Sequence, residues 1–161
     1  MIRVQYNKLI TATVYVINNE KVLLHEHKKY HTWFPLGGHV ESDEFPHEAA
    51  IREVKEESGL DVTLLETELA PPIELARVER IPAPFCLLHE GDGANENFFD
   101  FIYIAKTSET ELYPASNESK KFKWFSYDEL LKCEIKPHVK NTALAILNYC
   151  KKYVTHKTQN R

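Results

Sequence analysis

The sequence predicts a layered fold of the α/β or α+β class, built around a mixed β-sheet. Strand-like and helix-like segments follow one another in the order strands, helix, strands, helices, which is typical of such folds. The length of 161 residues suits one domain, and a hydrophobic fraction of 43% can supply its core. We therefore expect a single domain over residues 1–161, with a polar tail at 155–161 that frays.

The chain begins with a predicted hairpin. Residues 9–17 are rich in Val, Ile and Thr, and residues 21–27 form a second strand-like segment. Between them, Asn18-Asn19 can adopt the positive φ values that a tight hairpin turn requires. A third, short and aromatic strand is expected at residues 30–36.

A helix is predicted over Pro46–Ser58, after Gly37-Gly38 break the preceding strand. Pro46 suits the first turn of a helix, because its missing N–H would be unpaired there in any case. Gly59 is a natural residue just past the last turn, where a left-handed backbone is common.

The second half of the chain predicts further strands and two closing helices. Four prolines make the segment 70–85 irregular, and Gly91-Asp92-Gly93 is a turn. Ser126 is a candidate N-cap. The predicted strands are 61–69, 85–89, Asn97–Lys106 and Phe122–Phe125, and the helices are Tyr127–Lys132 and 137–153.

Composition excludes several classes of protein. A net charge of −4 and a pI near 6.1 argue against long nucleic acids and anionic membranes as partners. No apolar run approaches the ~18–20 residues of a membrane span. The run at 9–17 has no cleavage site and leads into a turn, so we expect no signal peptide. Three cysteines without a spacing pattern fit a reducing, cytoplasmic setting. The oligomeric state is left open, with a homodimer among the options.

The most informative feature is a cluster of acidic residues on the first helix. At about 100° per residue, Glu53, Glu56 and Glu57 share an arc of roughly 100°. Their apolar neighbours Ala50, Ile51 and Val54 occupy the adjacent sector, where they can pack on a sheet. The alternative interpretation is a solvated acidic face. Clustered carboxylates repel one another, and this density of hard oxygen ligands suits Mg²⁺ or Mn²⁺.

The surrounding pattern argues against that alternative. The stretch matches G-x5-E-x7-R-E-U-x-E-E-x-G-U, where U is aliphatic, and chance would produce this about once per 10⁹ starting positions. The matching residues are Gly38, Glu44, Arg52, Glu53, Val54, Glu56, Glu57, Gly59 and Leu60. Here the chain resembles the Nudix hydrolases, of the MutT-like kind. Trp33-Phe34-Pro35 and Lys123-Trp124-Phe125-Ser126 are also similar to segments of that family.

The resemblance implies a fold, an activity and a set of site residues. The fold would be an α/β/α sandwich around a mixed sheet. The activity would be pyrophosphohydrolase: water attacks phosphorus in a nucleoside diphosphate linked to another moiety, a small molecule, with Mg²⁺ or Mn²⁺ as cofactor. Glu53, Glu56 and Glu57 would bind the metal, with the Gly38 backbone nearby. The residues that would hold the loop–helix–loop in shape are Glu44, Arg52 and Gly59, and Arg52 would also belong to the catalytic set.

One more carboxylate is expected in the site, because members of this family often recruit one from a variable position. Asp100 lies in the apolar row of a strand that is predicted to be buried on both faces. Burying it unpaired would cost several kcal/mol, so we expect a cation partner. That partner would be a metal or one of three arginines, Arg52, Arg77 and Arg80. A purely structural Arg–Asp pair explains the same pattern, and Glu96 and Glu118 are rivals. The sequence favours Asp100 slightly over Glu118.

Several alternatives stay open at this point. The chain could bind such a nucleotide as a sensor without turning it over. An isomerase of a prenyl diphosphate is disfavoured, because no nucleophilic Cys lies beside the acidic stretch. The Pro-Leu-Gly-Gly-His-Val-Glu segment is similar to enzymes that convert a nucleoside triphosphate to the monophosphate and pyrophosphate. A nucleotide sugar or a dinucleotide is the alternative substrate. His25 and His27 share a strand face but suit a polar edge better than zinc. Tyr30, Trp33 and Phe34 can pack in the core or stack on a base.

Overall fold

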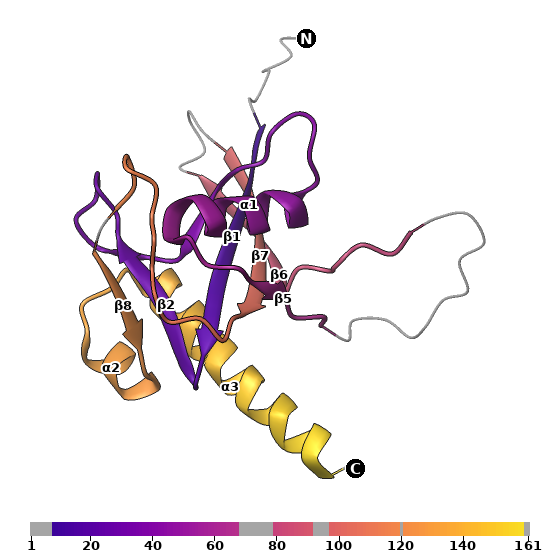
Figure 1. Cartoon of the computed structure of the whole chain (residues 1–161), viewed down its shortest axis with the longest axis vertical. Helices are drawn as coiled ribbons and strands as arrows, with labels where there is room; N and C mark the ends of the chain where they lie inside the picture. Colours follow the sequence, from indigo (N-terminus) through magenta and orange to yellow (C-terminus); the bar gives the residue numbers. More distant parts are fainter. Residues whose placement is uncertain (1–7, 68–78, 92–96, 120, 160–161) are drawn as a thin grey trace.

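The computed structural model describes residues 8–67, 79–91, 97–119 and 121–159 of the chain. Its strands form one mixed, eight-stranded sheet (Figure 1). The strands are β1 Lys8–Asn18, β2 Lys21–Glu26, β3 Trp33–Phe34, β4 Leu36–His39, β5 Thr63–Leu64, β6 Cys86–Gly91, β7 Asn97–Lys106 and β8 Phe122–Phe125. The helices are α1 Pro46–Ser58, α2 Tyr127–Lys132 and α3 Pro137–Gln159.

Strand β1 organises the sheet. It runs parallel to β7 along nearly its whole length, and it pairs antiparallel with both β2 and β4. β2 pairs with residues 16–18 of β1, whereas β4 pairs with residues 11–14. The mixed sheet predicted from the order of the elements is therefore confirmed.

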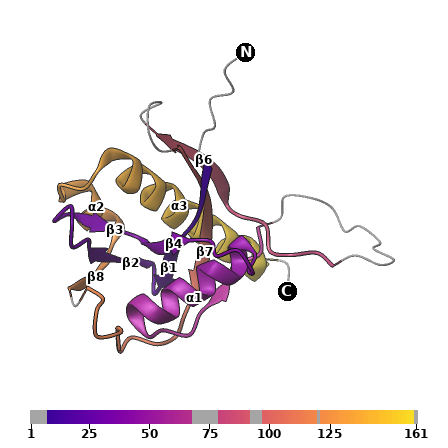
Figure 2. The same cartoon turned by 90° about the horizontal axis from the view of Figure 1, so that it is seen from above.

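The sheet is covered on both faces, as an α/β/α sandwich requires. Figure 2 shows α1 on one side of the strands and α3 on the other. Strand β1 serves both layers, because alternate residues point to opposite faces. Ala12, Val14 and Val16 belong to the core under α1, whereas Tyr15 and Ile17 belong to the core under α3.

Helix α1 forms where the local signals place it. Pro46 occupies its first turn, and the Glu48 carboxylate accepts a hydrogen bond of 2.8 Å from the backbone N–H of Phe45. Gly59 ends the helix with φ 78°, which is the left-handed conformation expected of it. Ala50 and Val54 are buried against the sheet, but Ile51 is 41% exposed, so the apolar sector of α1 is narrower than predicted.

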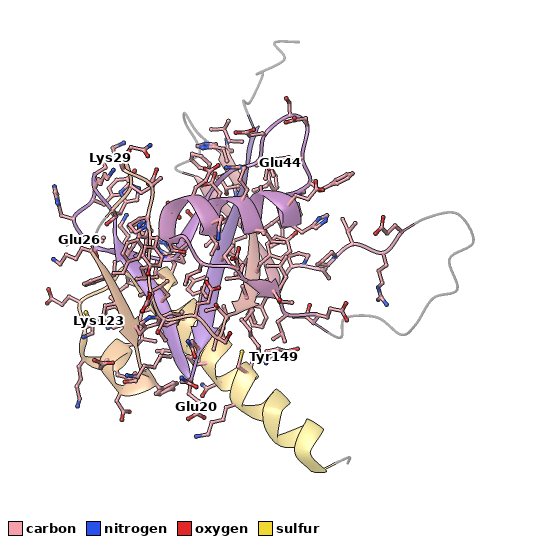
Figure 3. All side chains as sticks on the ribbon, in the orientation of Figure 1. Glu20, Glu26, Lys29, Glu44, Lys123 and Tyr149 are labelled. Atoms are coloured by element: carbon pink, nitrogen blue, oxygen red, sulfur yellow. The ribbon has the colours of Figure 1, made fainter. Side chains whose placement is uncertain are left out.

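Some predicted boundaries differ in the structure. The residues with positive φ in the hairpin turn are Asn19 and Glu20, because pairing of β1 continues through Asn18. Glu20 lies at the end of the sheet opposite Glu44 (Figure 3). The expected strand at 30–36 is divided into β3 and β4 around Pro35, and β4 includes both glycines that were expected to end it.

The second half of the chain agrees with prediction at β7, β8 and α2, including the Ser126 cap. β6 extends to Gly91, two residues past its predicted end. The predicted strand at 61–69 shrinks to β5, and its last two residues lie outside the described part of the chain, as do 70–78, Asp92 and Gly93. α3 continues to Gln159, so residues 155–159 are helical where a frayed tail was expected. No helix of the described residues is long and apolar enough to cross a membrane.

Candidate active site

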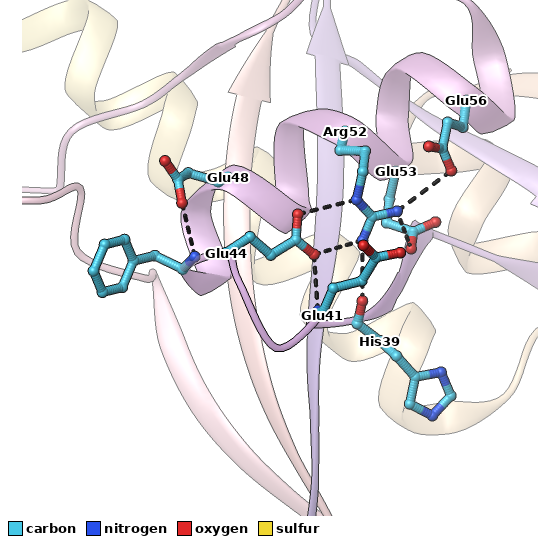
Figure 4. Close-up of polar contacts among 8 residues, drawn as sticks. His39, Glu41, Glu44, Glu48, Arg52, Glu53 and Glu56 are labelled. Atoms are coloured by element: carbon cyan, nitrogen blue, oxygen red, sulfur yellow. Dashed lines mark hydrogen bonds and ion pairs between the residues drawn. The ribbon is translucent and has the colours of Figure 1, made fainter.

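Arg52 is the centre of the polar network on α1 (Figure 4). Its guanidinium donates two hydrogen bonds to the Glu44 carboxylate, at 3.0 and 2.6 Å. It also donates to Glu53 at 2.8 Å, to Glu56 at 3.3 Å and to the backbone carbonyl of His39 at 3.1 Å. The hydrogen bonds from Arg52 lower the pKa of the Glu44 carboxyl. One cation therefore joins the helix to the loop before it and holds two of its acidic side chains.

The loop between β4 and α1 is tied down at several points. Glu44 Oε1 accepts a hydrogen bond of 2.9 Å from the backbone N–H of Glu41, in addition to those from Arg52. Paired hydrogen bonds between guanidinium and carboxylate are strong and directional. The loop conformation therefore depends on Glu44 and Arg52 together.

Glu57 points from the last turn of α1 toward β4. Its carboxylate accepts a hydrogen bond of 2.8 Å from the backbone N–H of Gly37. Removal from water raises the pKa of Glu57 to about 8, and the nearby carboxylates of Glu53, Glu118 and Glu56 add to the effect. The protein alone supplies too little positive charge at this position to keep Glu57 ionised at neutral pH.

Glu53 lies directly against the backbone of Gly38. A Cβ atom placed on Gly38 would come within 2.4 Å of Glu53 Oε1. Burial raises the pKa of Glu53, even though its hydrogen bond from Arg52 acts in the opposite direction. The glycine therefore allows a carboxylate of α1 to approach the β4 backbone.

These carboxylates do not converge on a single point. Within the described residues, no three His, Cys, Asp or Glu side chains are close enough together to hold a metal ion as they stand. Arg52 holds Glu53 and Glu56, while the Gly37 backbone holds Glu57. All three are nevertheless carboxylates on flexible stems within two turns of one helix, so their oxygens can be redirected by side-chain rotation alone.

A segment that follows β7 attaches to the end of α1. The backbone N–H groups of Tyr113 and Ala115 donate to the carbonyls of Ser58 and Glu56, at 2.8 and 3.1 Å. These bonds satisfy two carbonyls that the end of a helix leaves unpaired. Glu118 follows in the same segment and is one of the charges that act on Glu57. The sequence offered Glu118 as a rival, and the structure brings it to the acidic helix.

Asp100 lies on the other face of the sheet, under α3. It is 6% exposed, and its carboxylate accepts hydrogen bonds from the hydroxyls of Thr11 at 3.0 Å and Thr13 at 2.8 Å. Its hydrogen-bond partners are therefore two threonines on the neighbouring strand. Of the arginines expected as its partner, Arg52 pairs instead with Glu44, Glu53 and Glu56. Arg77 lies outside the described residues. Burial raises the pKa of Asp100, and the threonine hydroxyls counteract that effect.

A cavity of about 280 Å³ connects the two sets of carboxylates. Its lining includes Glu57 with Gly37 and Gly38 of β4, and also Asp100 on β7. Thr11, Thr13 and Tyr15 of β1 lie between these strands, and α3 contributes His138, Val139 and Thr142. Sequence reasoning missed the threonines and the polar residues of α3. Two threonines at alternate positions of an apolar strand were the available signal for a polar site on that face.

Aromatic side chains form another wall of this cavity. His27, Tyr30 and Phe34 contact one another, with ring centroids 4.7–5.7 Å apart. Burial lowers the pKa of His25 to about 4, and its Nδ1 atom has no hydrogen-bond partner. Of the three aromatic residues considered from the sequence, Tyr30 and Phe34 line the cavity, whereas the Trp33 ring packs 5.1 Å from that of Phe125.

Comparison with known proteins gives a consistent result. The model of the NUDIX domain family matches residues 7–146. A crystal structure of a NUDIX family hydrolase from Clostridium perfringens has a TM-score of 0.78 and 35% identity, covering 88% of this chain and 97% of that one. A MutT NUDIX hydrolase from Burkholderia pseudomallei has a TM-score of 0.62 and 20% identity, covering 86% and 97%.

A more distant structure is an ADP-ribose pyrophosphatase from Streptococcus suis, with a TM-score of 0.55 and 18% identity, covering 89% of this chain and 91% of that one. At this level of identity, and at that of the MutT hydrolase, the likeness concerns the fold alone. No curated protein matches the chain.

Proposed function

This chain belongs to the NUDIX family and is a hydrolase of that family, and from this premise we propose that it cleaves a phosphoanhydride bond in a nucleoside diphosphate linked to another moiety. The observation that carries the proposal is the group of carboxylates Glu53, Glu56 and Glu57, gathered beside Arg52 and the glycines of β4. A nucleoside triphosphate cleaved to the monophosphate and pyrophosphate is the first substrate to test. A nucleotide sugar and a dinucleotide are the others.

The residues present fit Mg²⁺ or Mn²⁺. The donors are carboxylate oxygens, which these hard cations prefer. Removal from water raises the pKa of Glu57 to about 8, and a bound cation would favour its ionised form. Glu53, Glu56 and Glu57 would hold the ion next to the Gly38 backbone. Bound there, it would offset the charge of the diphosphate and polarise its phosphorus–oxygen bonds.

The remaining residues position this set. Arg52 and Glu44 fix the loop before α1, and Gly59 allows Tyr113 to approach the end of the helix, because a Cβ there would lie 2.6 Å from the Tyr113 carbonyl oxygen. Within the described lining of the cavity there is no lysine or arginine to bind phosphate. A cation held by the glutamates would therefore offset the negative charge of the substrate.

A proton must leave the attacking water, and we assign its acceptance to Glu118. Its carboxylate acts electrostatically on Glu57, and its segment is attached to the end of α1. Asp100, which the sequence favoured as the additional carboxylate of the site, accepts hydrogen bonds from Thr11 and Thr13. We also propose a cytoplasmic setting for the protein, because its three cysteines are free thiols.

The proposal is tested by a substrate panel with identification of the products. Nucleoside triphosphates, nucleotide sugars and dinucleotides would be incubated with the full chain and Mg²⁺, and the phosphorus products separated and identified. We expect cleavage of a phosphoanhydride bond in at least one class. Tight binding of a nucleotide without any cleavage would contradict the proposal and would support a sensing module instead.

A further inference from the structure

Asp100 is a buried acidic residue that has no role in the proposed hydrolysis. It lies opposite Thr11 in the parallel register of β1 and β7, and opposite Leu88 in the register of β6 and β7. All three residues line the same cavity as Glu57 and Gly38. Because β4, β1 and β7 are adjacent in the sheet, one ligand in this cavity can reach from Glu57 to Asp100.

The carboxylate of Asp100 has hydrogen-bonding capacity to spare. An ionised carboxylate offers about four acceptor positions on its two oxygens. Thr11 donates to Oδ1 and Thr13 donates to Oδ2, so one position on each oxygen is filled. These two hydrogen bonds also fix the orientation of the carboxylate. What is left is a pair of adjacent acceptors, one on each oxygen, on a residue that lines the cavity.

The surroundings of Asp100 favour a flat, uncharged group that carries donors. The described lining has no lysine or arginine but includes three histidines, and the neighbouring carboxylates of Asp100 and Glu90 disfavour an anionic phosphate group at this end. Aromatic and aliphatic side chains provide the walls, among them Phe34, Phe98, Ile102 and Val139. Such walls suit the two faces of a heterocyclic base.

We propose that Asp100 determines base specificity, accepting two hydrogen bonds from adjacent N–H donors on the edge of a guanine-type base. This inference rests on the proposed function, because it places the phosphates of the same substrate beside Glu57. Guanine presents two adjacent donors, N1–H and the 2-amino group, and a carboxylate matches them with its two oxygens. Adenine and cytosine present an amino donor next to an acceptor, which would face a carboxylate oxygen unfavourably. Uracil offers one donor between two acceptors.

The two threonines hold the Asp100 carboxylate in one orientation. Each hydroxyl fills one acceptor position on one carboxylate oxygen, so a second position on each oxygen is not used by β1. Burial disfavours the charged form of Asp100, and two further donors from a base would offset that effect. Binding of the correct base therefore completes a network that is only half filled in the protein alone.

The test compares three purines that share N1–H and differ at the carbon between N1 and N3, where the xanthine carbonyl also places a hydrogen on N3. GTP carries an amino donor there, ITP carries hydrogen, and XTP carries an oxygen acceptor. We expect wild-type kcat/KM to fall ~10–100-fold from GTP to ITP, the loss of one hydrogen bond to a charged group, and further for XTP. Binding of GMP, IMP and XMP, measured by titration calorimetry, should follow the same order without any turnover.

Asp100→Asn then changes the pattern in a defined direction. An amide presents one acceptor and one donor, which complements the N1–H and the oxygen of xanthine rather than the two donors of guanine. In the variant, kcat/KM for GTP and the affinity for GMP should each fall at least ~10-fold, whereas kcat/KM for XTP and the affinity for XMP should rise. Its kcat for the preferred base should change little. Asp128→Asn, on the exposed start of α2, is the matched control and should keep the wild-type order.

The outcomes separate this inference from the proposed function. Cleavage of phosphoanhydride substrates with equal kcat/KM for the three purines, or with ATP or UTP preferred to GTP, overturns the inference and leaves the hydrolase intact. An unchanged base order in folded Asp100→Asn overturns it as well. Absence of cleavage for every diphosphate in the panel is the failure of the proposed function. A reversed preference for XTP in Asp100→Asn supports the role of Asp100.

Discussion

Glu57 on the last turn of α1 accepts a hydrogen bond of 2.8 Å from the backbone N–H of Gly37 on β4. The two residues are 20 positions apart in sequence, and the bond joins the acidic helix to the strand that borders the cavity. Removal from water, with repulsion from the nearby carboxylates, raises the pKa of Glu57, whereas this hydrogen bond acts in the opposite direction. The helix–strand contact therefore fixes the position of the carboxylate and favours its ionised form.

The two glycines of β4 should respond differently to alanine. In Gly38→Ala the new Cβ would meet only the movable end of Glu53, at 2.4 Å, so we expect a small loss of stability but a kcat reduced ~10-fold or more. In Gly37→Ala the Cβ would meet the Ala12 backbone oxygen at 2.3 Å, at a φ of 145°. This should cost ~2–4 kcal/mol of unfolding free energy. Urea denaturation and steady-state kinetics on both variants measure the contrast. Equal losses of stability would contradict it.

Arg52→Lys should weaken the loop before α1 although the charge is retained. A lysine offers one compact ammonium group in place of the two parallel donors that Glu44 now accepts, at 3.0 and 2.6 Å. We expect a loss of ~1–2 kcal/mol in unfolding free energy, together with reduced turnover. Asp61→Asn, which breaks the exposed pair with Lys55, is the control and should change stability by less than ~0.5 kcal/mol. A loss in Arg52→Lys no larger than in this control would contradict the structural role.

The sequence alone predicts those features of the fold and the site that depend on residues close together in the chain. The bounds of α1 follow from Pro46 and Gly59, which act within one turn, and the acidic face follows from helical periodicity. Asp100 was correctly expected to be buried, because both faces of its strand are apolar. Its two hydrogen-bond partners were not anticipated, since Thr11 and Thr13 reach it only through the parallel pairing of β1 with β7. No local signal encodes that register.

The attachment of the Tyr113–Glu118 region to α1 could not be predicted from the sequence either. It depends on backbone hydrogen bonds to the carbonyls of Glu56 and Ser58, and these carry no sequence signature. The sequence offered Glu118 and Asp100 as nearly equal candidates for the additional carboxylate. Only the fold separates them, since it places one beside Glu57 and the other between two threonines.

Glu118→Gln should lower kcat by ~10²-fold or more with little change in KM, because general-base catalysis typically contributes 10²–10⁴-fold. The amide keeps the size of the side chain but does not accept a proton from water. Glu66→Gln, at an exposed position on the same protein, is the matched control and should behave as wild type. If kcat is unchanged in Glu118→Gln and falls instead in Asp100→Asn for every base, the role moves to Asp100.

The pKa of Glu57, raised to about 8, predicts a pH dependence in the metal-free protein. Between its ordinary value of 4.5 and 8, the folded protein holds this proton while the unfolded chain has released it. Folding stability should therefore decrease as the pH rises through this window, and level off above it. Thermal melting in the presence of a chelator measures the slope, and Glu57→Gln should flatten it. A wild-type slope identical to that of Glu57→Gln would contradict the assignment.

The same proton competes with the cation. Apparent affinity for Mg²⁺ or Mn²⁺ should rise up to ~10-fold per pH unit until about pH 8, because binding needs the ionised carboxylate. Activity should rise toward alkaline pH for this reason and should vanish after exhaustive chelation. Ca²⁺ should bind but support turnover poorly, because its coordination is looser. Full activity in the chelated protein would contradict the cation requirement.

The most direct test of the account is turnover by Glu53→Gln and Glu57→Gln, measured with the best substrate of the panel and saturating Mg²⁺. Each substitution removes one carboxylate charge and keeps the size of the side chain, so circular dichroism should match wild type. If both carboxylates belong to the catalytic centre, kcat should fall ~10²-fold or more in both variants, and Glu66→Gln should retain wild-type turnover. Near-normal turnover by the two folded variants would contradict the claim that the carboxylates of α1 form the catalytic centre.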